Sequence, residues 1–237
     1  LEMSPDEFNF VENSLIQSMI YEASKTDVPV VIHLDHGDKY ETVVRAIQAG
    51  FTSVMIDASK LPYEENIAIT QKVCEVAHLA NVSVESELGT IGTTGNSIEG
   101  GTTGIIYTDP DQAKDFVEKT GVDVLAIAFG TSHGIYTQKP VLDLNRITEI
   151  KNKIDIPFVM HGGSGLSKEE FQTAVKNGIR KINYYTYMTL AGGKAVKAAL
   201  DKKSVEENIF YHDIPLIAMK AMKENVKVAI ETFALKN

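Results

Sequence analysis

Apolar positions along the chain form short continuous runs that alternate with stretches of helical spacing, which is the pattern of an α/β protein. The runs predict buried strands, and the spaced stretches predict amphipathic helices. Six strands are predicted, at 30–35, 53–57, 82–88, 124–130, 158–163 and 181–186. Helices are predicted at 4–26, 39–49, 65–80, 109–121, 147–154 and 167–177, with two or three more over about 190–237.

A weak internal repeat supports parallel pairing of these strands. The segments 50–57, 121–128 and 178–185 each begin with a helix-ending glycine, followed by an apolar residue, two further residues and a strand. Helix–glycine–strand units that recur at intervals of tens of residues indicate β/α units. Polar residues gather at the carboxyl ends of these strands, where parallel α/β folds place their sites.

The fold class that we predict is a TIM (β/α)₈ barrel, forming a single domain over 1–237. Six strands are two fewer than a closed barrel needs. Because the chain starts at Leu1 rather than a methionine, we expect the first two β/α units to be missing from it. An open sheet is the alternative.

Composition narrows the functional class. The chain of 237 residues carries a formal net charge of −9 with scattered Lys and Arg, which argues against a nucleic-acid or anionic-membrane surface. Cys74 is the only cysteine, so neither a disulfide framework nor a Cys-rich zinc site is possible. No apolar run reaches the ~18 residues of a spanning helix, and no leader pattern is visible. We expect a cytoplasmic protein.

Three predicted strand ends carry a histidine followed by glycine: His36, His133 and His161. Three imidazoles at separate strand ends can surround one point, which is a ligand set for a catalytic zinc with an open position. A single such histidine is more often structural, but three of the chain's six in one context favour a metal site. Asp35 precedes His36, and adjacent side chains diverge at a strand end, so one can bind metal while the other handles a proton.

A glycine-rich turn follows His161, just before a predicted helix. Gly162, Gly163, Ser164 and Gly165 expose backbone N–H groups, and such turns at helix N-termini bind phosphate. The motif is weak alone, but beside a metal ligand it predicts a phosphate pocket near the ion.

Several motifs together resemble the class II, metal-dependent ketose-phosphate aldolases, which include the fructose-bisphosphate and tagatose-bisphosphate enzymes. The motifs are HLDHG (33–37), FTSVMID with PYEENI (51–67), ESELG (85–89), YTDP (107–110), GTSHG (130–134), HGGSG (161–165) and KIN (181–183). They occur in order between about residues 28 and 200. The resemblance implies a TIM barrel whose first two strands precede this chain.

The resemblance also implies the roles of individual residues. His36, His133 and His161 look like the Zn²⁺ ligands, and Asp35 looks like the acid/base residue at the cleaved bond. The residues expected to bind dihydroxyacetone phosphate and line the substrate site are Gly134, Gly162, Gly163, Ser164, Asn183, Tyr184, Tyr185 and Thr186. Retro-aldol cleavage leaves negative charge on an enediolate, which a divalent metal stabilises without a lysine Schiff base. Glu85, Glu87 and Asp57 are candidate partners of the metal-binding imidazoles. We also expect a monovalent cation (Na⁺ or K⁺), a sugar-phosphate substrate, and a homo-oligomer, either dimer or tetramer.

Three departures from the fructose-bisphosphate pattern affect the expected substrate. Tyr185 replaces an Asp at the aldehyde half, while Thr189 and Thr137 replace an Arg and a Lys at the far phosphate. Neutral side chains do not replace two cations facing a dianion. We therefore expect a ketose 1-phosphate whose aldehyde half lacks a phosphate.

The alternatives stay open. One is a tagatose- or fructose-bisphosphate aldolase whose far phosphate is held by Arg180 or by a neighbouring subunit. Others are a non-catalytic aldolase-like subunit, which the intact Asp35 and histidines disfavour, and a metal-dependent isomerase on the same barrel, which the phosphate loop and Asn183 disfavour.

The Gly/Thr/Ser-rich stretch 89–104 has no apolar pattern and predicts a lid or binding loop. Family members carry acidic residues here, one of which moves the substrate proton. Glu99 is the only acid between this loop's start and Asp109, so we expect Glu99 to take that role.

Overall fold

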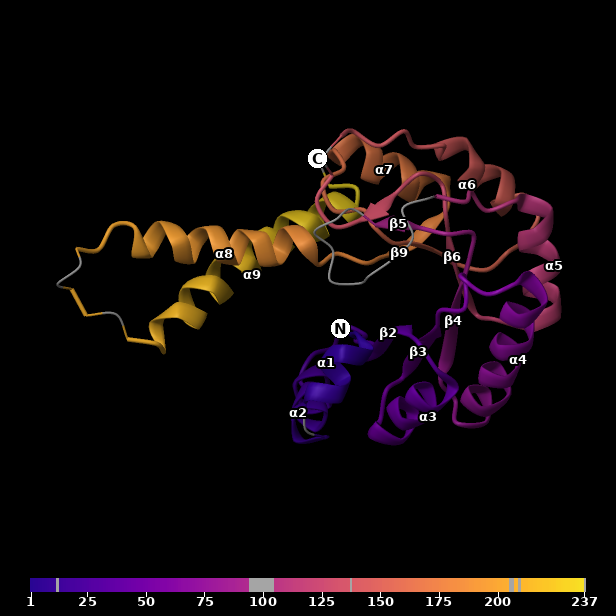
Figure 1. Ribbon diagram of the computed structural model, residues 1–237, viewed down its shortest axis with the longest axis horizontal. Helices are drawn as coiled ribbons and strands as arrows, with labels where there is room; N and C mark the ends of the chain where they lie inside the picture. The colour runs from indigo at the N-terminus through magenta and orange to yellow at the C-terminus, as the bar shows by residue number, and fades with distance from the viewer. Residues whose placement is uncertain (12, 94–104, 137, 205–206, 209, 237) are drawn as a thin grey trace.

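Parallel strands form a curled main sheet and a small second sheet in the computed structural model, which describes residues 1–11, 13–93, 105–136, 138–204, 207–208 and 210–236 (Figure 1). The strands are β1 (Glu2–Met3), β2 (His33–Gly37), β3 (Ser53–Ile56), β4 (Ser83–Leu88), β5 (Gly92–Thr93), β6 (Val124–Ile127), β7 (Ser132–His133), β8 (Phe158–Met160) and β9 (Ile179–Ile182). The helices are α1 (Pro5–Phe10), α2 (Asn13–Ala23), α3 (Tyr40–Ala49), α4 (Tyr63–Leu79), α5 (Pro110–Thr120), α6 (Leu144–Lys151), α7 (Lys168–Asn177), α8 (Thr186–Leu200) and α9 (Asp213–Phe233).

The main sheet has the order β1-β2-β3-β4-β6-β8-β9, and every neighbouring pair is parallel. Helices α3 to α7 cover its outer face (Figure 1), and the core lies between them and the strands. Phe51, Phe116 and Phe158 are among its fully buried side chains. Burial of this apolar face against the helices is the main force that closes the layers. The predicted α/β barrel-type fold is therefore confirmed.

The predicted count of six strands is wrong, because β1 adds a seventh to the main sheet. Glu2 and Met3 pair with His33 and Leu34 of β2. A two-residue strand is too short to show any hydrophobic period, so the sequence pattern gives no sign of it. The pair β5–β7, a separate two-stranded sheet, is missed for the same reason.

The single helix predicted over 4–26 is also wrong. Ser4 and Glu7 form the capping box that starts α1, as its sequence suggests, but Val11 adopts extended backbone and ends that helix. A second helix, α2, begins at Asn13. Two strand boundaries also differ from the predicted ones. β2 begins at His33 rather than at residue 30, and β9 ends at Ile182 rather than at residue 186.

The last two helices form a hairpin that projects from the body (Figure 1). α8 and α9 pack mainly on each other, and the end of α9 returns to α7, where Phe233 contacts Phe171. Within the described ranges, none of the helices combines the length and apolar character that crossing a membrane requires.

Candidate metal and catalytic site

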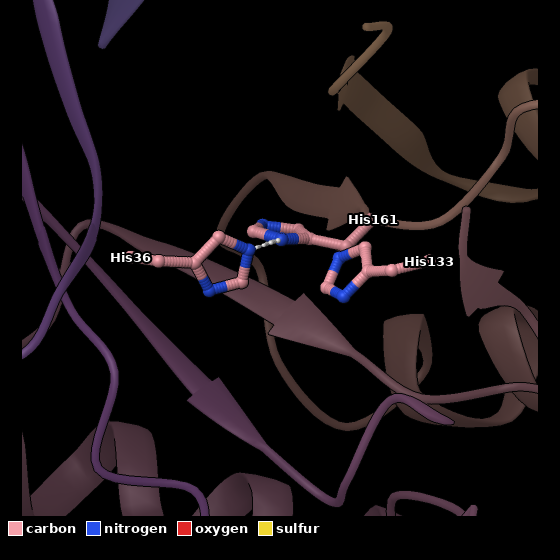
Figure 2. Close-up of side chains that lie close together, drawn as sticks. All are labelled: His36, His133 and His161. Atoms are coloured by element: carbon pink, nitrogen blue, oxygen red, sulfur yellow. Dashed lines mark hydrogen bonds between the residues drawn. The ribbon is translucent and has the colours of Figure 1, made fainter. Parts of the chain in front are cut away.

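Three imidazoles meet at the carboxyl ends of the strands (Figure 2). His36 comes from β2, His133 from β7, and His161 follows β8. The ring centroids lie 5.0 Å apart for His36 and His133, 4.6 Å for His36 and His161, and 5.8 Å for His133 and His161. One nitrogen of each ring lies within 4.8 Å of the others. The convergence expected from the sequence is therefore present.

The backbone at His36 explains how two adjacent residues reach the same cavity. A regular strand would send Asp35 and His36 to opposite faces. His36 instead has φ of 48°, in the left-handed region, and the β2–β3 register shifts between Leu34 and Gly37. This irregularity turns the imidazole towards the side that Asp35 faces, and both residues line the cavity. Left-handed backbone at a non-glycine residue is the kind of strain that functional sites retain.

Two carboxylates orient two of the rings. The Nδ1–H of His36 donates to Asp57 Oδ2 at 2.9 Å, and the Nε2–H of His161 donates to Glu85 Oε1 at 2.8 Å. These bonds leave His36 Nε2 and His161 Nδ1 facing each other, 2.9 Å apart. Carboxylate–imidazole pairs of this kind fix the tautomer of metal-binding histidines.

Electrostatics distinguish the three rings. Burial lowers the pKa of His161 to about 3, and burial with the nearby His36 charge holds the pKa of His133 well below its usual range. Burial also acts to lower the pKa of His36, but the carboxylates of Asp35, Asp57 and Glu87 outweigh it and raise that pKa to about 10. Of the three rings, His36 is therefore the one whose surroundings favour the protonated form.

The donor set fits a divalent cation. The carboxyl of Glu87 is buried, and its Oε2 has no hydrogen-bond partner among the described residues. Burial, followed by the charge of Asp57, raises the pKa of Glu87 to about 8. A metal ion between the three imidazoles would satisfy the nitrogens and the surrounding negative charge together.

Asp35 lies beside this cluster, held by the side chain of Asn183. The amide Nδ2 of Asn183 donates to Asp35 Oδ1 at 2.8 Å. Asn183 directly follows β9, so this bond joins opposite parts of the curled sheet. A carboxylate fixed in this way at a cavity wall is placed to exchange a proton with a bound substrate.

The glycine-rich turn packs closely on the segment that carries His133. Gly162 has φ of 65°, and a Cβ there would lie 2.5 Å from the carbonyl carbon of Ser132. The hydroxyl of Tyr136 donates to Gly162 O at 2.6 Å and accepts from the Ser132 N–H at 3.0 Å. Ser167 then starts α7 with the predicted capping box. At position 162, only glycine permits both the left-handed backbone and the close approach to Ser132.

A cavity of about 700 Å³ opens beside the histidines. Its lining includes the polar residues Asp35, His36 and His133 and the apolar residues Met188, Ile230 and Phe233. The described residues around it include no lysine or arginine side chain. They include the carboxylates of Glu2, Asp6, Glu7, Asp35 and Asp38.

Most residues expected at the substrate site border this cavity. They are Gly134, Gly162, Ser164, Asn183, Tyr184, Tyr185 and Thr186. Gly163 packs instead towards Met160 and Phe171. The hydroxyl of Tyr184 donates to Asn225 of α9. Glu99 and Thr137 lie outside the described residues.

The suggestion that Arg180 holds a far phosphate is wrong. Arg180 is exposed within β9, away from the cavity lining, and its Nη1 donates to the carbonyls of Val175 and Ile179. Sequence reasoning also missed Glu2, Tyr136 and Lys181, which contact the site's residues. Lys181 stands in the KIN motif, which was the one available signal for it.

Comparison with known proteins gives concordant matches. A family model described as fructose-bisphosphate aldolase class-II matches residues 1–237. The chain is 43% identical over 225 residues to the fructose-bisphosphate aldolase of Staphylococcus aureus (strain Mu50 / ATCC 700699), covering 94% of this chain and 76% of the relative. The YdjI aldolase from Escherichia coli K12 aligns with a TM-score of 0.83 and 33% identity, covering 98% of this chain and 80% of that one. A fructose-bisphosphate aldolase from Campylobacter jejuni, with a TM-score of 0.74 and 22% identity over 100% of this chain and 83% of that one, supports the fold alone.

Proposed function

The chain belongs to the class II fructose-bisphosphate aldolase family, and from this premise we propose that it cleaves a ketose 1-phosphate to dihydroxyacetone phosphate and an aldehyde without a second phosphate. Class II aldolases are metal-dependent lyases, so the reaction class follows from membership. The residue roles and the substrate are the proposal. Its main support is the convergence of His36, His133 and His161 beside Asp35.

We assign the metal to the three imidazoles and propose that it is Zn²⁺. Two of the rings are oriented by Asp57 and Glu85, which is the arrangement expected around a bound ion. When bound there, the metal supplies Lewis-acid stabilisation for the negative charge left by carbon–carbon cleavage.

Asp35 handles the proton at the cleaved bond. As the bond breaks, its carboxylate takes the proton from the hydroxyl on the carbon that becomes the aldehyde. The bonding electrons stay with the fragment that becomes dihydroxyacetone phosphate, and that carbon then gains a proton. Asn183 keeps the carboxylate of Asp35 in place through the 2.8 Å hydrogen bond.

We propose that Glu99 delivers this second proton, since it is the only acid in the stretch 94–104. A Glu99→Gln variant should lose turnover while its metal content and its fold stay those of the wild type. Full turnover in that variant would remove Glu99 from the mechanism.

The phosphate of the substrate is assigned to the turn at Gly162, Gly163 and Ser164, together with Gly134. Backbone N–H groups in such turns bind phosphate without side-chain obstruction. A monovalent cation, Na⁺ or K⁺, near this turn belongs to the same proposal. Exchange of both ions for choline should then raise the KM for the sugar phosphate.

The substrate's aldehyde half is assigned to the rest of the cavity, whose described lining offers carboxylates and apolar groups but no lysine or arginine side chain. A second phosphate would meet negative charge there without a compensating cation. This favours a neutral aldehyde.

A fructose- or tagatose-bisphosphate substrate is the second candidate, favoured by the activity for which the Staphylococcus relatives are named. A panel of ketose 1-phosphates with and without a second phosphate distinguishes the two. Each should be assayed with and without a chelator. We expect a higher kcat/KM for the monophosphates and no cleavage after chelation, whereas a preference for bisphosphates would support the second candidate.

We further propose that the protein is a homo-oligomer, a dimer or a tetramer. The projecting α8–α9 hairpin leaves apolar side chains such as Leu216 and Met219 more than half exposed, at 56% and 60%. Burial of these side chains between subunits would be favourable. Light scattering coupled to gel filtration should give a mass of two or four chains, and a monomer mass would contradict this assignment.

A further inference from the structure

Lys181 has contacts that the proposed reaction does not use. Its ammonium lies 2.8 Å from Glu2 Oε1 and 3.0 Å from Glu85 Oε2, and it donates to Asn183 Oδ1 at 2.7 Å. The side chain is 27% exposed and Glu85 only 1%. One cation on β9 therefore connects an edge strand, β1, with the central strand β4 and with the residue that holds Asp35.

Two of these contacts lead directly to the candidate site. Asn183 donates to Asp35 Oδ1, and Glu85 accepts from His161 Nε2. Resting on the proposed function, we propose that Lys181 is a positioning residue that orients the acid/base carboxylate Asp35 and the metal ligand His161 at the same time.

Lys181 acts on Asp35 through Asn183, and this effect depends on the orientation of the Asn183 amide. The two ends of an asparagine amide differ, because the oxygen accepts hydrogen bonds and the NH₂ group donates them. Lys181 donates to the oxygen, which leaves the NH₂ group directed at Asp35. Without the ammonium, the amide can rotate and present its oxygen to the carboxylate, which repels it.

The path through Glu85 depends on charge. Glu85 is fully enclosed and interacts with His161 at one oxygen and with Lys181 at the other. A buried carboxylate that loses its cation moves towards other donors. Such a movement weakens the acceptor that fixes the tautomer of His161.

Lys181 also contacts a neighbouring cluster of potential metal ligands. His33, Asp35 and Glu85 offer ligand atoms within 4.8 Å of one another. The ammonium of Lys181 already supplies positive charge to that group. Burial acts to lower the pKa of Lys181, but Glu85, Glu2 and Asp35 outweigh it and hold that pKa above its usual value.

The test replaces Lys181 by Met, which keeps the length of the side chain and removes its charge. We expect kcat to fall about 10- to 100-fold and the dissociation constant for Zn²⁺, measured against a chromophoric chelator, to rise by about the same factor. The control is Lys176→Met, an exposed lysine of α7, which should change neither quantity. Should circular dichroism show that the Met variant does not fold, Lys181→Gln carries the same prediction.

Double-mutant cycles separate positioning from a general structural effect. In a Glu85→Gln background, Lys181→Met should raise the Zn²⁺ dissociation constant by less than a further threefold. The contact through which Lys181 acts on His161 is already lost in that background. In an Asn183→Ala background, Lys181→Met should likewise lower kcat by less than a further threefold. Independent, multiplying effects in both cycles would overturn the proposal.

The outcome is separable from that of the proposed function. A folded Lys181→Met variant with wild-type kcat and wild-type Zn²⁺ affinity overturns the role of Lys181 and leaves the aldolase assignment intact. If the wild-type protein cleaves no sugar phosphate, the proposed function fails, while the Zn²⁺ measurements still decide whether Lys181 positions His161.

Discussion

At the scale of single residues, the site depends on which side chains carry charge. Among the three histidines, His36 alone is expected to be protonated in the metal-free protein, because carboxylates surround it, whereas His133 and His161 are neutral. Neutral imidazole is the form that binds metal. Metal binding should therefore release the proton of His36. Because the imidazoles bind the metal, Asp35 stays available for the substrate.

The Asp35→Asn variant tests the division of labour between Asp35 and the histidines. An amide cannot accept the substrate's hydroxyl proton, so kcat should fall about 10²- to 10⁴-fold. Metal content, measured by atomic absorption, should stay at the wild-type level because the three imidazoles remain.

The matched control is Asp155→Asn, at an exposed position, which should retain the wild-type kcat. An Asp35→Asn protein with more than a tenth of the wild-type kcat would show that another group takes the proton.

At the scale of elements, loops and short strands hold the residues of the site, and the longer helices and strands support them. The turn at Gly162 packs on Ser132, and the hydroxyl of Tyr136 joins the two segments. The phosphate turn and the segment bearing His133 are thus one packed unit. A change in either should disturb both phosphate binding and the metal ligand.

Gly162→Ala tests this packing. Its Cβ would lie 2.5 Å from the Ser132 carbonyl carbon, and the left-handed backbone disfavours alanine by a further 1–2 kcal/mol or so. We expect a lower melting temperature and a raised KM for the sugar phosphate.

Gly193→Ala in α8 is the control, and it is expected to change the melting temperature in the opposite direction. No atom of the described residues lies within 4 Å of its Cβ position, and alanine favours a helix interior by about 0.5–1 kcal/mol over glycine. Its melting temperature should rise slightly while the KM stays unchanged. A Gly162→Ala protein as stable as the wild type, with an unchanged KM, would contradict the packing argument.

The elements also show where sequence reasoning succeeds. Local signals were sufficient for α5, which Asp109 caps, and for α7, which begins with the Ser167 capping box. Two-residue strands such as β1 carry no periodicity, and the break at Val11 has no proline or glycine to mark it. These features follow from tertiary packing.

At the scale of the whole molecule, the parallel topology brings distant residues to one place. His36 and His161 are 125 residues apart in the chain, yet their nitrogens lie 2.9 Å apart. Recurring strand ends made this meeting predictable. The left-handed backbone of His36 and the links from Lys181 to Glu2 and Glu85 were not, because they depend on contacts between strands that share no local pattern.

The central claim is that one metal ion binds where β2, β7 and β8 deliver their histidines. The most direct measurement is anomalous X-ray diffraction at the zinc absorption edge from crystals of the zinc-loaded protein. We predict a single strong peak in contact with His36, His133 and His161 and adjacent to Asp35. A peak elsewhere, or the absence of any peak between these three rings at full zinc loading, would contradict it.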